Sequence, residues 1–166
     1  MKTVKLLLLA LVSAFAFKTA ASQNVLFNIL TQNAGLVHKG KTTFLEVTVN
    51  NTDPTSFVGL YKLRVQISVP TAIASIPATG HVLPTNWTIT SRNDTTIILS
   101  NGKDLIAAHD ARTLLIAIRG NKIGGPSTIT GQLSFSNGQA PGTAPGTLPG
   151  DNPADNVSTT TCKVVR

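Results

Sequence analysis

The sequence predicts an all-β fold in which two antiparallel sheets pack face to face. Apolar and polar residues alternate along several segments, clusters of turn-forming residues separate these segments, and no stretch combines helical apolar spacing with capping residues. A period of two places one face of each strand in the core and the other in water, which favours an antiparallel sheet. Two sheets packed face to face would bury these apolar stripes.

The strongest strand signal lies at residues 61–69, where Tyr61, Leu63, Val65, Ile67 and Val69 alternate with polar residues. The same alternation predicts strands around 44–49, 114–118 and 129–135. Shorter strands are predicted, in chain order, at 25–30, 71–76, 87–90, 96–99 and 157–164. Turn clusters fall between them at 50–56, 78–80, 91–94, 101–104 and 120–126. Residues 104–112 come nearest to a helix but are too short for one.

Residues 1–22 have the order of a secretory signal peptide. Two lysines precede the apolar run Leu6–Phe17, and the small and polar residues Lys18–Ser22 follow it. A membrane-spanning helix needs about 20 apolar residues, so we expect cleavage before Gln23, with cleavage before Ser22 as the alternative. No cysteine follows for lipid attachment, and no later segment is long enough to anchor the chain. The expected location is secreted or in the cell envelope, either extracellular or periplasmic.

Residues 23–166 are predicted to form one domain with a self-sufficient core. Removal of the signal peptide leaves eleven basic and seven acidic residues, a net charge of +4. The basic residues occur singly or in pairs, which we interpret as solvation and edge protection and which argues against a nucleic-acid partner. Cys162 is the only cysteine, so an internal disulfide is excluded and the thiol is predicted to be buried.

Residues 137–156 are predicted to form a loop rich in proline and glycine. Ala140-Pro-Gly-Thr is followed at once by Ala144-Pro-Gly-Thr and then by Leu148-Pro-Gly-Asp. Proline cannot donate to a strand ladder and glycine weakens one. The small side chains favour a disordered or loosely turned segment over a binding loop.

Four motifs resemble the conserved-repeat, immunoglobulin-like domains of bacterial surface proteins, a domain-of-unknown-function family. They are a glycine before an alternating strand and Asn-Thr at 40–52, a strand ending in proline at 65–70, an aliphatic strand at 105–120, and Asp-Asn-Pro-Ala-Asp-Asn at 151–156 before the last strand. The resemblance implies an immunoglobulin-like antiparallel β-sandwich of about 7–9 strands. The family has tandem copies, whereas this chain has room for one.

No catalytic residues, cofactor or zinc site is predicted. His38, His81 and His109 lie tens of residues apart, and although Asp110 follows His109, neighbouring residues on a strand point to opposite faces. There is no nucleophile-elbow glycine pattern and no pair of acids suited to glycoside hydrolysis. We therefore expect that the protein is not an enzyme.

Calcium is the strongest of the weak metal candidates. Asp151, Asn152, Asp155 and Asn156 offer oxygen ligands on one turn. Their spacing is not that of a calcium loop, so the sequence favours a turn in which these side chains bond their own backbone. On that interpretation, calcium would leave the melting temperature unchanged.

Aromatic residues offer little support for a sugar platform. Trp87 is predicted to lie in the core between the sheets, whereas alternation places Phe44 opposite Leu45 and Val47 and hence towards solvent. Sequons begin at Asn50, Asn86, Asn93 and Asn156, as expected in a threonine-rich chain.

The leading functional hypothesis is an exported, non-catalytic structural or interaction module of the bacterial cell envelope or extracellular matrix, with an unknown protein or glycan partner at the cell surface. The chief alternative is a pilus-like subunit that exchanges strands through an edge such as 25–30. Oligomers abolished by deleting residues 23–30 would support it. A carbohydrate-binding module is the third hypothesis, and full glycan affinity in a Phe44→Ala variant would remove its support.

Overall fold

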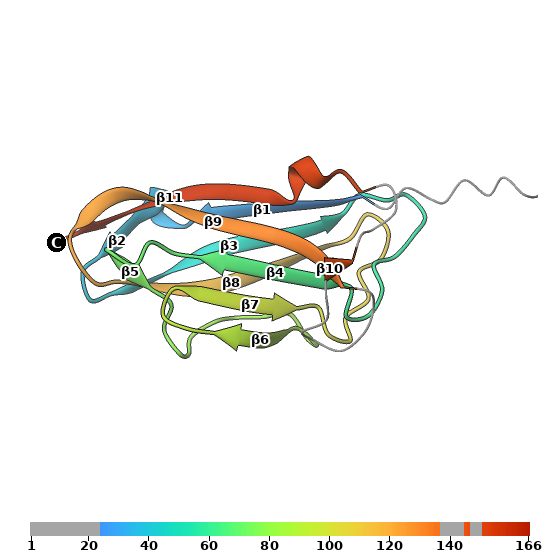
Figure 1. The fold of residues 1–166 in the computed structure, drawn as a ribbon, viewed down its shortest axis with the longest axis horizontal. Coiled ribbons are helices and arrows are strands. Elements are labelled where there is room, and N and C mark those ends of the chain that lie inside the picture. Colours follow the sequence, from blue (N-terminus) through green and yellow to red (C-terminus); the bar gives the residue numbers. More distant parts are fainter. Residues whose placement is uncertain (1–23, 137–144, 147–150) are drawn as a thin grey trace, which may run out of the picture.

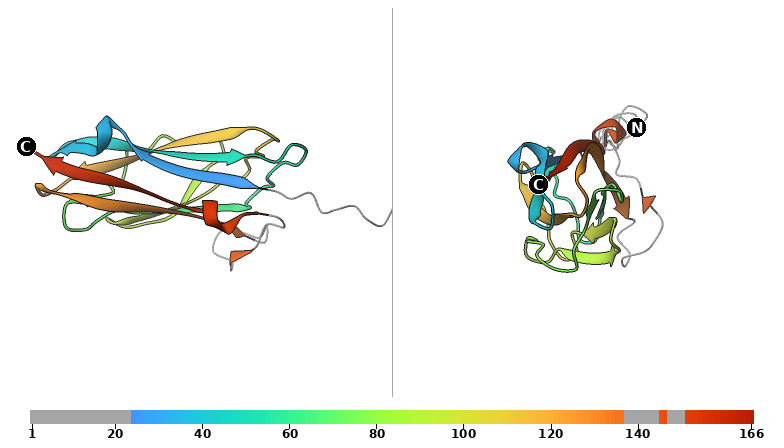
Figure 2. Two further views of the ribbon diagram at one scale, coloured as in Figure 1. Left: turned by 90° about the horizontal axis from the view of Figure 1, so that it is seen from above. Right: turned by 90° about the vertical axis from the view of Figure 1, so that its left-hand side faces the viewer.

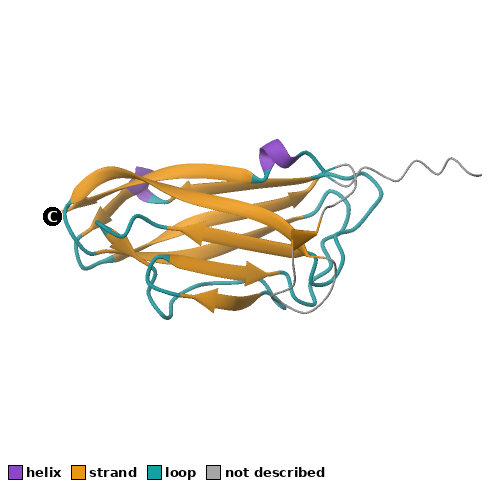
Figure 3. Ribbon diagram, viewed as in Figure 1, coloured by secondary structure: helices purple, strands orange, loops and turns teal. Residues whose placement is uncertain are grey.

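The computed structural model describes residues 24–136, 145–146 and 151–166 and confirms the all-β prediction (Figure 1). Two short 3-10 helices, η1 (Asn33–Gly35) and η2 (Pro153–Asp155), interrupt the strands (Figure 3). The strands are β1 (Val25–Thr31), β2 (Leu36–His38), β3 (Thr42–Asn51), β4 (Leu63–Ser68), β5 (Ala74–Ser75), β6 (Thr88–Arg92), β7 (Thr96–Ser100), β8 (Ala111–Gly120), β9 (Gly124–Ser136), β10 (Pro145–Gly146) and β11 (Val157–Val165).

The strands form two sheets that pack face to face. One sheet has the order β1-β3-β8-β5, and the other has the order β2-β11-β9-β4-β7-β6, with β10 paired to the end of β9. Neighbouring strands are antiparallel except β2 and β11, which run parallel. Because β1 and β2 belong to different sheets, the chain crosses between the sheets through η1 (Figure 2).

The core forms where the sequence alternates. On β3, Leu45, Val47 and Val49 are fully buried, while Phe44 and Glu46 on the opposite face are half-buried. Strands β1, β2, β4, β7, β8, β9 and β11 contribute buried Ile, Leu or Val in the same manner, whereas every residue of β6 is exposed. Burial of each such side chain contributes about 1.5–3 kcal/mol relative to exposure, so packing alone can hold the two sheets together.

Gly131 allows β1 to approach β9 across the core. A Cβ atom at this position would lie 2.8 Å from Cγ2 of Ile29 and 2.8 Å from two ring atoms of Phe27. Real Cβ atoms do not pack this closely because interiors are already close to crystal density. The glycine is therefore a packing requirement of the interface between the two sheets.

Cys162 on β11 is buried, as predicted, with 1% of its surface exposed. Burial raises the pKa of its thiol, so little thiolate forms at neutral pH. We expect an aromatic disulfide reagent to modify native Cys162 at least about 100-fold more slowly than the chain unfolded in guanidinium. Equal rates in the two states would contradict the burial of this thiol.

Several predicted boundaries are wrong for local reasons. Tyr61 does not belong to β4, because its φ is +55° and its N–H donates to the carbonyl of Gly102 in a turn. The predicted strand 71–76 shrinks to β5, since the N–H groups of Ile73 and Ala74 both donate to the carbonyl of Pro70 and bend the chain. The predicted turns 50–56 and 91–94 begin two residues too early, because β3 extends through Asn51 and β6 through Arg92. The predicted turn 120–126 is too long, because β8 extends through Gly120 and β9 already begins at Gly124.

Other sequence predictions fall partly outside the described residues. The predicted signal peptide 1–22 lies outside them, as do 137–144 and 147–150 of the predicted loop. Within that loop, β10 pairs with β9 and η2 precedes β11, so two of its short segments have regular structure. Among the described residues, no helix is long and apolar enough to cross a membrane.

Candidate functional site

The strands run along the long axis of the molecule, so their connections gather at two ends (Figure 1). We call the end that holds the turns 39–41, 69–78, 93–95 and 121–123, the adjoining strand residues Arg92 and Arg119, and residues 163–166 the basic end. The opposite end, with 52–62, 101–110 and 151–156, is the loop end. Figure 1 shows the basic end on the left, where the chain reaches its C-terminus.

The two ends carry opposite net charge. Seven of the eleven basic residues that follow the predicted signal peptide lie at the basic end, where Asp94 is the single acidic side chain, giving a net charge of about six positive. The rest of the domain has four basic and six acidic residues and is net negative by two. The seven basic residues are Lys39, Lys41, Arg92, Arg119, Lys122, Lys163 and Arg166. Folding thus gathers charges that are dispersed in the sequence.

Backbone hydrogen bonds hold the basic end together. Gly40 N–H donates to the carbonyl of Gly120 at 2.7 Å, and Lys39 N–H donates to the carbonyl of Val165 at 2.8 Å. Asn121 N–H donates to the carbonyl of Ile73 at 2.7 Å. These bonds join turns from distant parts of the chain, so the backbone that carries the lysines and arginines is fixed in place.

An open groove of about 590 Å³ lies beside β5 at this end, between the edge of one sheet and the β6–β7 turn of the other. Arg92 and Arg119 both line it. Ser75 on β5 pairs with Arg119 on β8, and Ile76 N–H donates to the carbonyl of Asp94 at 2.7 Å. Polar side chains complete the lining, among them Thr71, Ser75, Asp94, Thr95 and Asn121.

The guanidinium groups that line the groove have N–H donors available for a ligand. The Arg92 side chain donates to the carbonyl of Ile76 at 3.2 Å, and the Arg119 side chain makes no hydrogen bond or ion pair within the described part of the chain. Asp94 lines the same groove but lies outside ion-pair distance of both arginines. Because a guanidinium presents a planar fork of donors, this groove is suited to carboxylate, sulfate or phosphate groups.

The three histidines lie in different parts of the fold and do not form a common site. His81 is held between Pro77 and β8: Ala117 N–H donates to Nδ1, which leaves Nε2 to donate to the Pro77 carbonyl. Burial, with the nearby positive charge of Arg92, lowers the pKa of His81, which keeps it neutral. His38 contacts the carbonyl of Arg166 at the basic end, and exposed His109 lies in a loop-end turn.

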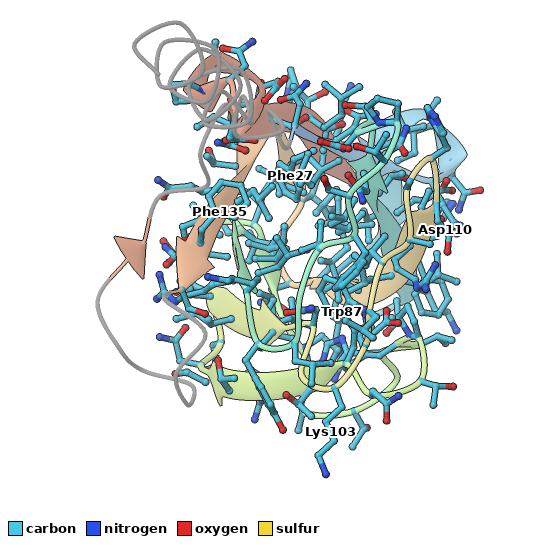
Figure 4. All side chains as sticks on the ribbon, turned by 90° about the vertical axis from the view of Figure 1, so that its right-hand side faces the viewer. Phe27, Trp87, Lys103, Asp110 and Phe135 are labelled. Atoms are coloured by element: carbon cyan, nitrogen blue, oxygen red, sulfur yellow. The ribbon has the colours of Figure 1, made fainter. Side chains whose placement is uncertain are left out.

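At the loop end, Trp87 and Arg112 meet on one carboxylate. The indole Nε1 of Trp87 donates to Asp104 at 2.9 Å, and Arg112 binds the same Asp104 through Nε and Nη2 at 2.8 and 3.2 Å. Arg112 also donates to Asp110, which lowers the pKa of that carboxyl, while Asp104 raises the pKa of Arg112. Figure 4 views this end and shows Lys103 projecting outward while Trp87 lies nearer the centre.

The calcium-candidate residues of the sequence lie together on the turn before β11. Asp151 accepts from Val25 N–H through Oδ1 and from the Asn156 side-chain amide through Oδ2. Asn152 Oδ1 accepts from Ala154 N–H and so caps η2. In the described ranges there is no group of three or more His, Cys, Asp or Glu side chains arranged to hold a metal ion.

Side chains from the C-terminal part of the chain occupy the outer edge of β1. Asp151 Oδ1 accepts from Val25 N–H at 3.2 Å, and Ser158 Oγ accepts from Ile29 N–H at 3.1 Å. The hydroxyl of Thr31 donates to the carbonyl of Thr161 at 2.9 Å. β1, the strand predicted for exchange with a neighbouring subunit, is therefore already hydrogen-bonded on the side that does not pair with β3.

No family model matches the chain, and no curated protein matches it in sequence. Among solved structures, it is similar to a cohesin module from a Clostridium perfringens family 33 glycoside hydrolase, with a TM-score of 0.50 and 9% identity, covering 85% of this chain and 98% of that one. The fold is an immunoglobulin-like β-sandwich. The predicted fold class is confirmed.

Two further solved structures resemble the chain at lower scores. A CARDB domain from Pyrococcus furiosus gives a TM-score of 0.48 and 13% identity over 86% of this chain and 95% of its own. A non-cellulosomal cohesin from Archaeoglobus fulgidus gives a TM-score of 0.47 and 9% identity, and the match covers 86% of this chain and 92% of the cohesin. Identities this low leave the choice of function to the residues of this chain.

Proposed function

We propose that the protein is an exported, non-catalytic interaction module of the bacterial cell surface or matrix, and that its basic end binds an anionic polysaccharide. The observation that carries the proposal is the charge segregation, with a net charge of about six positive at one end and two negative over the rest. Export rests on the sequence of residues 1–22. Membership of the conserved-repeat surface family rests on the four motifs described above.

The groove explains why a polymer with carboxylate or sulfate groups fits. Arg92 and Arg119 supply guanidinium forks, while neighbouring hydroxyl and amide groups can bond sugar hydroxyls. Lys39, Lys41 and Lys122 lie on short turns outside the groove, Lys163 lies near the end of β11, and all four add long-range attraction. An extended polyanion would contact both, whereas a small ligand would contact the groove alone.

The bonds along β1 argue against the strand-exchange alternative. Pairing with a neighbouring subunit would require displacing the Asp151 and Ser158 side chains from the N–H groups that they accept. Phe44, the proposed sugar platform, is half-buried on the outer face of its sheet and does not line the groove. Both features favour recognition by charge at one end.

The test compares two matched double variants of the mature chain from Gln23. Arg119→Gln with Lys122→Gln should weaken binding to polygalacturonate or dextran sulfate at least about tenfold, because exposed charges act within a Debye length of about 10 Å. Lys62→Gln with Lys103→Gln removes the same charge at the loop end and should change affinity by less than about twofold. Calorimetry at 50 and 200 mM salt measures both, and binding should weaken with salt.

Equal losses in the two double variants would overturn the assignment of the basic end. Lack of binding to either polyanion at 50 mM salt would overturn the proposal as a whole. Tighter binding to duplex DNA than to both polysaccharides would replace the glycan with a nucleic-acid partner. Neutral dextran is the control for binding that needs no charge.

A further inference from the structure

Two buried oxygen atoms at the turn before β11 lack a hydrogen-bond donor. They are Oδ1 of Asp155 and Oδ1 of Asn156, both fully shielded from solvent and without a partner among the described residues. Only 8% of the Asn156 residue is exposed. An unsatisfied buried acceptor costs about 1–3 kcal/mol, and more for a charged group, so a ligand that contacts both oxygens would stabilise the turn.

The hydrogen bonds of the turn place the Asn156 oxygen near a carboxylate. Nδ2 of Asn156 donates to Asp151 Oδ2 at 2.6 Å, so its amide oxygen points elsewhere. The oxygen and nitrogen of one amide lie about 2.2 Å apart, which places Asn156 Oδ1 within about 5 Å of Asp151 Oδ2. Two oxygens that each coordinate one Ca²⁺ at about 2.3–2.6 Å lie at most about 5 Å from each other.

The orientation of Asp151 and Asn156 is fixed by contacts outside the turn. Val25 N–H donates to Asp151 Oδ1 at 3.2 Å, and Leu133 N–H donates to the backbone carbonyl of Asn156 at 2.7 Å. Each carboxylate oxygen keeps a second lone pair after accepting one hydrogen bond. β1 therefore holds the Asp151 carboxylate and β9 holds the backbone of Asn156, while the side-chain oxygens keep lone pairs for a cation.

We propose that Asp151, Asp155 and Asn156 bind a calcium ion, with water as the remaining ligands. The ligand set consists of two carboxylates and one amide oxygen, which are hard ligands of the type that Ca²⁺ takes in irregular geometry. Mg²⁺ demands a near-ideal octahedron and releases its water reluctantly, so it fits this turn less well. A site with two carboxylates corresponds to the affinity of extracellular modules, a Kd of about 0.1–1 mM.

The experiment uses the mature chain, calorimetric titration with CaCl₂, and thermal unfolding at constant ionic strength. We expect a Kd of about 0.1–1 mM and a melting temperature about 3 to 5 °C higher in 10 mM CaCl₂ than in 10 mM MgCl₂. Asp155→Asn keeps the side-chain shape and removes one charged ligand, so affinity should fall at least about tenfold. Asp94→Asn, at the basic end, is the matched control and should bind calcium as the parent does.

Amide NMR resolves where the ion acts. Calcium-dependent changes in amide chemical shift that are confined to residues 151–157 and their neighbours on β1 support the site. Changes in chemical shift that are spread evenly over all acidic residues overturn it. No calcium-specific heat in the parent protein up to 10 mM also overturns it.

Discussion

Replacing Gly131 with valine should destabilise the protein by about 3 kcal/mol or more. Even a single added Cβ would lie 2.8 Å from Ile29 and from two atoms of the Phe27 ring, and valine adds two further methyl groups. Overpacking a filled core forces side chains from their rotamers and shifts the backbone. The melting temperature should fall by roughly 10 °C. Urea unfolding followed through the fluorescence of buried Trp87, the only tryptophan, measures the change.

Two further variants test the cause of this loss. Thr130→Val alters the neighbouring residue on the exposed face of β9 and should change stability by less than about 0.5 kcal/mol. Combining Gly131→Val with Phe27→Ala should recover part of the loss, because the truncated ring makes room for the valine. If the double variant shows the plain sum of the two single losses, steric conflict with Phe27 is not the reason.

The Asn101→Ala substitution should cost about 3–5 kcal/mol. Asn101 is fully buried, its Oδ1 accepts from Leu63 N–H at 2.9 Å, and its Nδ2 donates to the carbonyls of Gly59 and Asp104 at 2.9 and 2.8 Å. Alanine would leave these three backbone groups without this partner, and each such loss costs about 1–3 kcal/mol. The same urea experiment measures it.

Asn50→Ala is the control for this second experiment. Asn50 is half-buried on the outer face of β3, and its loss should cost less than about 0.5 kcal/mol. Asn101→Asp adds a sharper test, since a carboxylate keeps the shape but cannot donate to the two carbonyls. If Asn101→Asp were as stable as the parent protein at pH 7, these donated bonds would not be what holds the turn.

Period-two alternation predicts the core strands well because burial on one face determines which residues a strand can tolerate. Leu63, Val65 and Ile67 are predicted to face the core, and all three do. The pattern fails at Tyr61, where a local turn with positive φ changes the direction of the chain. Turn residues mark where a strand stops only to within a few positions.

The candidate sites depend on contacts between segments far apart in the sequence. Asn101 lies in a predicted turn, yet nothing in the sequence shows that its amide bonds Gly59, which is 42 residues away. Arg92 and Arg119 likewise have no common motif, and the sandwich brings them to one groove. By contrast, the turn at 151–156 could be singled out because its oxygen-bearing residues are close in sequence. Its orphaned oxygens could not, because burial is a property of the fold.

The direction of the terminal strands has a mechanical consequence. β1 begins at the loop end, and β11 ends at the basic end beside β2, to which it is parallel. A force that pulls residues 24 and 166 apart would therefore slide β1 and β2 past β11 along their lengths. The bonds of Ile29 to Ser158, Thr31 to Thr161 and Lys39 to Val165 would then share the load and have to break together, whereas a hairpin pulled from one end opens bond by bond.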